Sequence, residues 1–239
     1  MSRNILHHMT LREALSNIHR DPHWWRKVGI GGALALTIIG IPWPVGTTIV
    51  SLENTLKGFP YPLPPWNDWG TRYIIGFFTI LLDLVLFGFP LMFIGLFACC
   101  VLAISTLSAN PAATGWVVTT MIGIVIAFQL LLFTLSICPI SRLIFLREGR
   151  IEDAMGMRPF REALHPEVRR TYLRIRLRSL PVYLPFLLCV TVLLLTFQLP
   201  FSGAGIVGFI LVWLSLSSLF YAHLAVAQLY ATINISRHN

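Results

Sequence analysis

Charged residues are scarce in this chain. Asp, Glu, Lys and Arg make up 12% of its 239 residues, whereas a soluble domain carries about 25%. Hydrophobic residues make up 56%, and the mean hydropathy is +0.73. Several uncharged runs exceed the roughly 18 residues typical of a transmembrane helix, and these runs lack the alternation of a transmembrane barrel. The composition therefore argues against a soluble domain and predicts an all-α, polytopic helical membrane protein.

Sequence signatures of catalysis are missing as well. The chain contains no GxSxG, HExxH, P-loop or GxGxxG motif. Its four cysteines lie in apolar stretches without CxxC spacing and without histidines at ligand spacing: Cys99, Cys100, Cys138 and Cys189. We interpret them as packing residues. The first 27 residues contain no apolar signal-peptide core. We therefore expect no enzymatic activity, no metal site and no required cofactor.

The long apolar segments predict about four full transmembrane helices within a single membrane domain, residues 1–239. These spans are residues 73–107, 115–138, 180–199 and 205–232. A helix over the first of these runs would be about 52 Å long, well beyond a hydrocarbon core of about 30 Å. We therefore expect a kink at Pro90. An architecture with six spans is the alternative.

The first apolar stretch, residues 28–57, is interrupted by IGIPWPVG at residues 39–46. Of the 18 Lys and Arg residues, five precede residue 28 and ten lie between residues 142 and 178. One crossing at 28–57 would put these basic regions on opposite sides, against the positive-inside rule. We therefore predict a re-entrant hairpin with its tip at IPWP, covered by other helices.

This hairpin fixes the predicted topology in the cytoplasmic (inner) membrane. The N-terminus, the basic loop at residues 139–179 and the C-terminus are then cytoplasmic. The charge-free loops at 108–114 and 200–204 lie on the other side. Within the basic loop, Gly149 and Gly156 are expected to end helices and Pro166 to begin one.

Residues 1–27 are predicted to form a cytoplasmic amphipathic segment. Thr10 and Glu13 have the spacing of a capping box for a helix over residues 10–20. Leu11, Leu15 and Ile18 share one face of that helix, which we expect to lie on the membrane surface.

Basic residues beside the apolar segments are predicted to bind anionic lipid headgroups. A basic soluble domain would instead indicate nucleic acid, which we do not expect as a partner here. The predicted headgroup ligands are Arg26, Lys27, Arg169, Arg170, Arg174, Arg176 and Arg178.

Two polar residues inside apolar runs are candidates for chemistry. Asp83 could handle an ion or a proton, because a carboxylate at the bilayer centre costs at least about 2.5 kcal/mol. It could equally be a hydrogen-bonded residue near the interface, and no basic residue lies three or four positions from it. His223 could ligate a pigment or haem, although a lone histidine is more often a structural hydrogen-bond partner.

Four motifs occur along the chain in a fixed order: DPHWWRKVGIGG; LPPWNDWG, followed by Gly76 and Pro90; RLIFLREGRIEDA; and YAHLAVAQLY. In this order they resemble an uncharacterised family of bacterial and archaeal membrane proteins, the domain of unknown function numbered four thousand and thirteen. The resemblance covers nearly the whole chain and implies a membrane protein, without an activity to carry over. This chain has Gly46 and Thr47 followed by SLENTLK where family members resemble Gly-Tyr followed by several arginines.

Three functions are compatible with these features. The first is a non-catalytic accessory or scaffold subunit that associates with other membrane proteins. The second is a small transporter or channel, which rests on Asp83, the broken first segment and the polar residues of the last helix. The third is a pigment- or haem-binding subunit of a photosynthetic or respiratory complex, which rests on His223.

Overall fold

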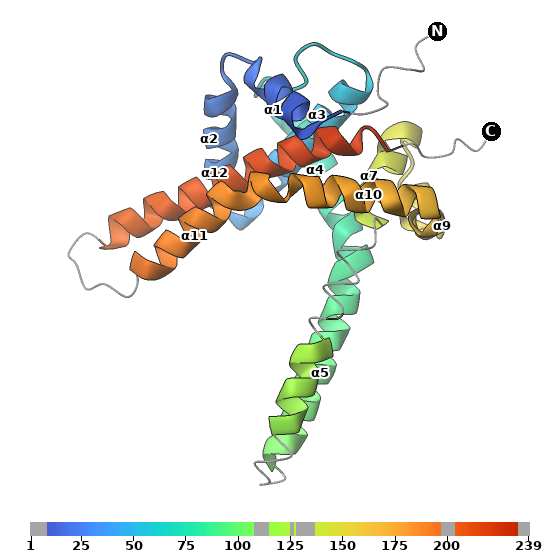
Figure 1. Cartoon of the computed structure of the whole chain (residues 1–239), viewed down its shortest axis with the longest axis vertical. Helices are drawn as coiled ribbons and strands as arrows, with labels where there is room; N and C mark the ends of the chain where they lie inside the picture. The colour runs from blue at the N-terminus through green and yellow to red at the C-terminus, as the bar shows by residue number, and fades with distance from the viewer. Residues whose placement is uncertain (1–8, 108–114, 125–126, 128–136, 197–203, 234–239) are drawn as a thin grey trace. The chain divides into compact units, whose positions relative to one another are not determined.

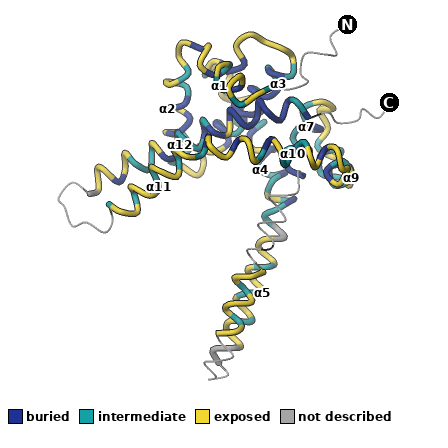
Figure 2. The backbone as a smooth tube through the Cα atoms, in the orientation of Figure 1, coloured by how far each residue is buried: buried dark blue, intermediate teal, exposed yellow. Residues whose placement is uncertain are grey.

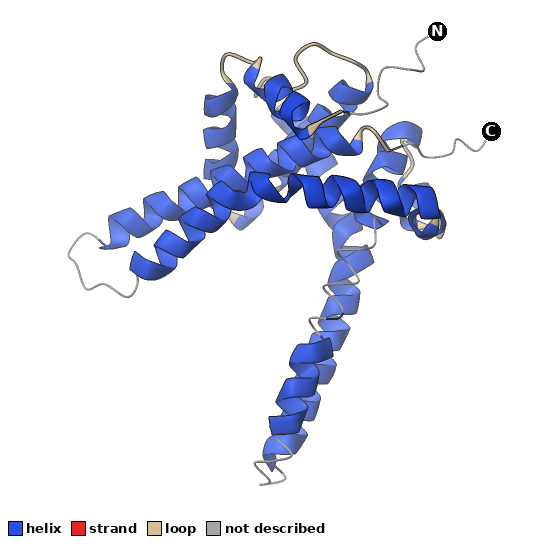
Figure 3. Cartoon of the chain, viewed as in Figure 1, coloured by secondary structure: helices blue, strands red, loops and turns tan. Residues whose placement is uncertain are grey.

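A computed structural model of the chain describes residues 9–107, 115–124, 127, 137–196 and 204–233. All regular structure within these residues is helical, joined by short loops (Figure 3). The chain divides into two compact units, residues 1–80 with 170–239 and residues 81–169. The all-helical fold class is confirmed for the described residues.

The first unit is built from helices at both ends of the chain (Figure 1). Its elements are α1 (Leu11–His19), α2 (Trp24–Ala35), the 3₁₀ turn η1 (Ile38–Gly40), α3 (Pro42–Leu56), most of α4 (Trp69–Asp83), most of α10 (Pro166–Ser179), the 3₁₀ turn η3 (Leu180–Tyr183), α11 (Leu184–Thr196) and α12 (Ala204–Tyr230).

Helix α12 organises the first unit and contacts α1, α2, α3 and α11. Its C-terminal part, from Leu224 to Tyr230, is buried throughout, whereas residues such as Ile206, Phe209 and Ile210 in its N-terminal part are exposed (Figure 2). Exposed apolar side chains are normal on a helix that faces lipid. The two halves of α12 therefore have different roles, one as core and one as outward-facing apolar surface.

The second unit contains the π-helical segment η2 (Leu84–Gly88), α5 (Phe89–Leu107), α7 (Ile137–Glu148), α8 (Ile151–Met155) and α9 (Arg158–Leu164). Helices α7, α8 and α9 pack on one another. The buried Ser141 donates a hydrogen bond from Oγ to the carbonyl of Ala154 at 2.6 Å, which ties α7 to α8. An ion pair between Arg158 and Glu148 ties α9 to the end of α7.

Within the described residues, three helical stretches are long and apolar enough to cross a membrane: Trp69–Gly88, Pro166–Thr196 and Gly205–Tyr230. Shorter apolar helices cover Leu91–Ile104 and Gly115–Ile124. The membrane-embedded class is thereby supported, and the three long stretches overlap the predicted spans 73–107, 180–199 and 205–232. Most of the predicted span 115–138 beyond residue 124, and residues 197–199, lie outside the described residues, so the count of four spans stays a prediction.

Local signals in the sequence are confirmed at several helix ends. Thr10 caps α1, with its backbone N–H bonded to Glu13 Oε2 at 2.7 Å and its Oγ1 accepting from the Glu13 N–H at 3.3 Å. Gly149 follows α7 with a φ of +68°, a conformation that favours glycine. Gly156 ends α8, and α10 begins at Pro166.

Two expectations are corrected. Leu11, Leu15 and Ile18 of α1 pack against a core cluster with Phe220 and Leu224 of α12, so this face is covered by protein rather than by the membrane surface. Helix α3 already includes IPWP from Pro42 onward, so the turn between α2 and α3 spans residues 36–41 instead.

The long run at residues 73–107 changes helix type where the kink was expected. Helix α4 ends at Asp83, the π-helical segment η2 follows, and α5 begins at Phe89. Pro90 has no N–H to donate to the carbonyl four residues earlier, and π-helical segments commonly accompany such interruptions.

Candidate functional site

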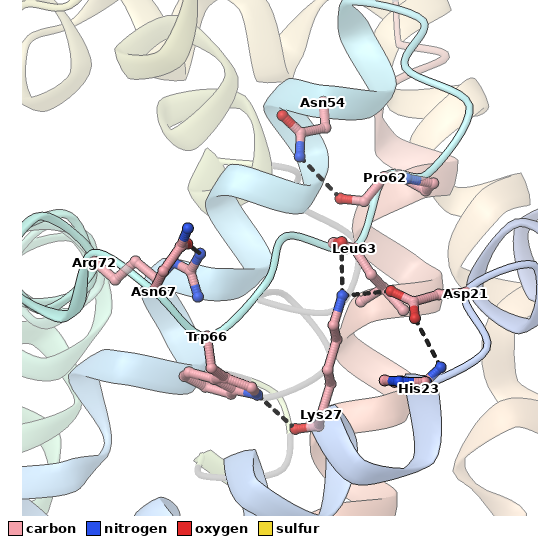
Figure 4. Close-up of polar contacts among 9 residues, drawn as sticks. All are labelled: Asp21, His23, Lys27, Asn54, Pro62, Leu63, Trp66, Asn67 and Arg72. Atoms are coloured by element: carbon pink, nitrogen blue, oxygen red, sulfur yellow. Dashed lines mark hydrogen bonds and ion pairs between the residues drawn. The ribbon is translucent and has the colours of Figure 1, made fainter.

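A proline-rich linker, residues 57–68, is held against the first unit by side chains from three helical segments (Figure 4). Asn54 of α3 donates from Nδ2 to the carbonyl of Pro62 at 3.1 Å. Lys27 of α2 donates from Nζ to the carbonyl of Leu63 at 3.1 Å. Trp66 in the linker donates from Nε1 to the carbonyl of Lys27 at 3.1 Å. We refer to Asp21, Lys27, Asn54, Trp66 and Arg72 as the linker clamp.

Lys27 is the centre of the linker clamp. Its ammonium forms an ion pair with the mostly buried carboxylate of Asp21. Asp21 in turn accepts from the backbone N–H of His23 at 2.8 Å through Oδ1. Lys27 was predicted to bind a lipid headgroup, and its side chain is instead engaged within the protein. The neighbouring Arg26 is exposed, so its predicted headgroup role stays a prediction.

The end of the linker is fixed by aromatic and guanidinium contacts. Arg72 of α4 is almost fully buried. Its Nη2 donates to Asn67 Oδ1 at 3.1 Å, and its guanidinium carbon lies 5.7 Å from the centre of the Trp66 ring. Trp43 of α3 donates from Nε1 to the carbonyl of Trp69 at 2.9 Å. Arg72 was not among the sequence-based candidates, because no motif marks a cation that is to be buried beside Trp66 and Asn67.

Two helix crossings in the same unit leave no room for a side chain. A Cβ added at Gly46 of α3 would lie 2.0 Å from the carbonyl oxygen of Arg72, and one at Gly76 of α4 would lie 1.8 Å from that of Pro42. A Cβ at Gly32 of α2 would lie 2.0 Å from Ser217 Oγ of α12. Small residues at helix interfaces allow this close backbone approach in membrane proteins.

Asp83, the candidate for ion or proton handling, is paired with a cation in the second unit. Arg142 of α7 contacts both carboxylate oxygens, with Nε 3.4 Å from Oδ1 and Nη2 in an ion pair with Oδ2. The buried Cys138, one helical turn before Arg142, also interacts with Asp83 through its thiol. The cation comes from a position 59 residues away, so inspection of the nearby sequence could not identify it.

His223, the candidate pigment or haem ligand, lies on the exposed side of α12. Its Nδ1 is 2.8 Å from the carbonyl oxygen of Leu219, so this nitrogen donates the hydrogen bond. Its ring packs edge-on against Tyr183 at 6.0 Å between centroids. These contacts fit a structural histidine, and within the described residues no three His, Cys, Asp or Glu side chains gather as a metal site would require.

The predicted headgroup arginines of α10 lie mostly on its outward side. Val168, Tyr172, Ile175 and Ser179 are buried, and Tyr172 stacks on Tyr230 at 5.7 Å. Arg176 is partly buried and donates from Nη1 to the Tyr183 hydroxyl at 3.4 Å. Four arginines are exposed: Arg169, Arg170, Arg174 and Arg178. Helix α10 therefore presents a basic face directly before the apolar helix α11.

The structure also shows buried polar groups on α3 and α12. Helix α3 buries four hydroxyl side chains, Thr47, Thr48, Ser51 and Thr55. Gln228 of α12 is fully buried, and within the described residues neither Gln228 nor the Oγ of Ser51 has a hydrogen-bond partner. A buried polar group without a partner costs about 1–3 kcal/mol, so these groups require an explanation beyond packing.

Comparison with known proteins identifies one family. The model of the family described as "Protein of unknown function (DUF4013)" matches residues 30–196, more than half of the chain. The chain belongs to this family. No curated protein and no solved structure matches the chain.

The matched region of this DUF4013 protein includes much of the arrangement described above. It contains the linker motif LPPWNDWG, Gly76 and the motif RLIFLREGRIEDA, which starts with Arg142, the partner of Asp83. The flanking motifs DPHWWRK and YAHLAVAQLY lie outside the matched range. Asp21 and Lys27 of the first flanking motif nevertheless meet the linker motif in the linker clamp.

Proposed function

We propose that this protein is a non-catalytic accessory or scaffold subunit of an assembly in the cytoplasmic membrane. One observation carries the proposal: the motif residues are used to hold the fold together. Lys27, Trp66, Gly76 and Arg142 are engaged in a linker contact, a helix crossing or an ion pair. In an enzyme or transporter, such residues more often converge on a ligand site.

The residues most suited to chemistry support the same proposal. Asp83 is paired with Arg142, Asp21 with Lys27, and His223 contacts Leu219 and Tyr183. A proton path within a membrane normally needs several titratable groups in a chain. These residues belong instead to separate local contacts.

The exposed apolar helices offer a surface for partner subunits. Phe93, Leu96, Phe97 and Ile104 of α5 are each more than half exposed. Phe93 and Phe97 are one helical turn apart and therefore lie on one face. Helix–helix association in membranes depends on packing of such faces.

The proposal is tested by isolating the tagged chain from native membranes at its natural expression level. We expect the same membrane proteins in near-equimolar amounts by quantitative mass spectrometry, and recovery of this chain when those partners are tagged instead. The double substitution Phe93→Ala and Phe97→Ala should reduce recovery without changing thermal stability, because both side chains are exposed. An unrelated multi-pass protein is the control. Recovery of this chain alone in mild detergent, with a single-chain mass, would overturn the proposal.

A small transporter or channel is a second candidate, favoured by the buried polar groups. Ser51 and Gln228 lie on two helices that pack on each other, α3 and α12. Polar side chains at membrane depth commonly line a solute path. A flux assay in proteoliposomes distinguishes the candidates: flux abolished by Gln228→Leu, in a variant that still folds, would favour transport over the scaffold.

A further inference from the structure

The turn between α2 and α3, residues 36–41, presents isoleucines outward. Ile38 is 87% exposed and Ile39 is 74% exposed, an unusual position for side chains of this kind in water. The turn is nevertheless held by a defined cap. Thr37 accepts from the Gly40 N–H at 3.0 Å through Oγ1, and the same hydroxyl donates to the carbonyl of Leu34 at 3.1 Å. The isoleucines therefore lie on an ordered apolar tip.

The backbone around this tip is bonded within the chain. The Gly40 N–H donates to Thr37, the Ile41 N–H to Ile38 and the Val45 N–H to Ile41, at 3.0, 3.4 and 3.3 Å. A helix start normally leaves four N–H groups for water to satisfy. Prolines have no N–H, so Pro42 and Pro44 remove two of these donors from the first turn of α3. Such a helix start suits hydrocarbon, which offers no hydrogen bonds.

The length of α2 sets how deep the tip can lie. At the start of α2, Trp25 is 62% exposed and Arg26 is exposed, and both residue types favour the membrane interface. Helix α2 has 12 residues, about 18 Å at 1.5 Å per residue. This is slightly more than half of a hydrocarbon core of about 30 Å. With Trp25 and Arg26 at the interface, Ile38 and Ile39 reach the middle of the bilayer.

The returning helix α3 is shielded from lipid. Nine of its 15 residues are buried, including its hydroxyl side chains, and it contacts α2 and α12. Gly46 brings it against the backbone of α4. The outer surface of this hairpin is thus apolar at the tip, while the hydroxyl side chains of α3 are buried within the protein.

We infer that the 36–41 turn is a lipid-contact surface that binds acyl-chain ends at the centre of the bilayer. The hairpin enters from one leaflet and does not reach the opposite aqueous phase. This inference does not depend on the proposed scaffold role.

The test uses the full-length protein with its four cysteines replaced by alanine. Single variants Ile38→Cys and Trp25→Cys carry an environment-sensitive fluorophore and are reconstituted as single copies in nanodiscs of phosphatidylcholine and phosphatidylglycerol. Lipids with a nitroxide at the headgroup or at the acyl-chain end act as quenchers. Because both side chains are exposed, the labelled proteins should retain the parental melting temperature, which is measured first.

We expect the Ile38 probe to be blue-shifted and quenched more strongly by the acyl-chain-end nitroxide than by the headgroup nitroxide. The Trp25 probe should show the opposite order. Quenching of the Ile38 probe by an aqueous quencher would overturn the inference, because the tip would then lie in water. A blue-shifted Ile38 probe that neither nitroxide quenches would also overturn it, because protein would then cover the tip.

Discussion

At the scale of single residues, the close approach of α4 to α3 at Gly76 predicts that a larger side chain there destabilises the fold. Gly76→Ala would place a Cβ 1.8 Å from the carbonyl oxygen of Pro42, which is backbone and cannot move aside alone. We expect a loss of about 1–3 kcal/mol in the free energy of unfolding, the usual cost of overpacking. Gly70→Ala in the same helix is the matched control, because nothing lies within 4 Å of its Cβ position. Thermal unfolding in detergent measures both variants, and equal melting temperatures would contradict the crossing.

The Asp83–Arg142 pair gives a second prediction at this scale. Asp83→Asn removes the charge that balances Arg142, so we expect the free energy of unfolding to fall by about 1.5–3 kcal/mol, the range for hydrogen bonds to charged groups. The sequence alone showed no basic residue three or four positions from Asp83 that could stabilise the carboxylate. Arg142→Gln and the double variant complete a mutant cycle.

The double variant should be less destabilised than the sum of the two single variants. Additive effects would show that the pair contributes no coupling. Flux in proteoliposomes that Asp83→Asn eliminates would instead assign the carboxylate to proton or cation transport and would contradict the scaffold proposal.

At the scale of elements, α10 is expected to respond to the charge of the surrounding lipid. Its exposed arginines precede α11 directly, and each cation near an anionic surface contributes about 1 kcal/mol. Added phosphatidylglycerol should therefore raise the melting temperature of the protein more than phosphatidylcholine does, and salt should weaken the difference. Replacement of Arg170, Arg174 and Arg178 by Gln should remove the difference, whereas replacement by Lys should keep it. Equal stabilisation by both lipids would refute a headgroup role.

Elements also show how far the sequence could predict the structure. The cap at Thr10 and the helix end at Gly149 were predicted correctly, because both depend on residues within one or two turns. The ion pair between Asp83 and Arg142 and the hydrogen bond from Lys27 to the carbonyl of Leu63 were missed, because the partners lie 59 and 36 residues apart in the chain. The turn between α2 and α3 lies a few residues before the predicted position at IPWP, because the prediction placed the two prolines in the turn. Pro42 and Pro44 instead occupy the first turn of a helix, a position that proline favours.

At the scale of the whole molecule, the distribution of charge predicts the orientation in the membrane. The basic residues before Val28 and those between 142 and 178 should lie on one side, because lysine and arginine are retained in the cytoplasm. We therefore expect the N-terminus, residues 141–179 and the C-terminus to be cytoplasmic. The loops at 108–114 and 200–204, which carry no charged residue, are expected on the outside.

Cysteine accessibility in a cysteine-free background tests this orientation. Ser2→Cys, Ser108→Cys and Ser202→Cys probe positions outside the described residues, and Glu167→Cys probes an exposed position at the start of α10. A membrane-impermeant maleimide added to intact cells should label residues 108 and 202 only, and after permeabilisation it should label all four. The comparison of residues 2 and 167 tests the hairpin, because residue 2 would lie on the side opposite residue 167 if residues 28–57 crossed the membrane once. Labelling of residue 2 but not of residue 167 in intact cells would contradict the re-entrant hairpin and favour a single crossing by residues 28–57. Labelling of residue 108 from the cytoplasm alone would contradict the predicted orientation.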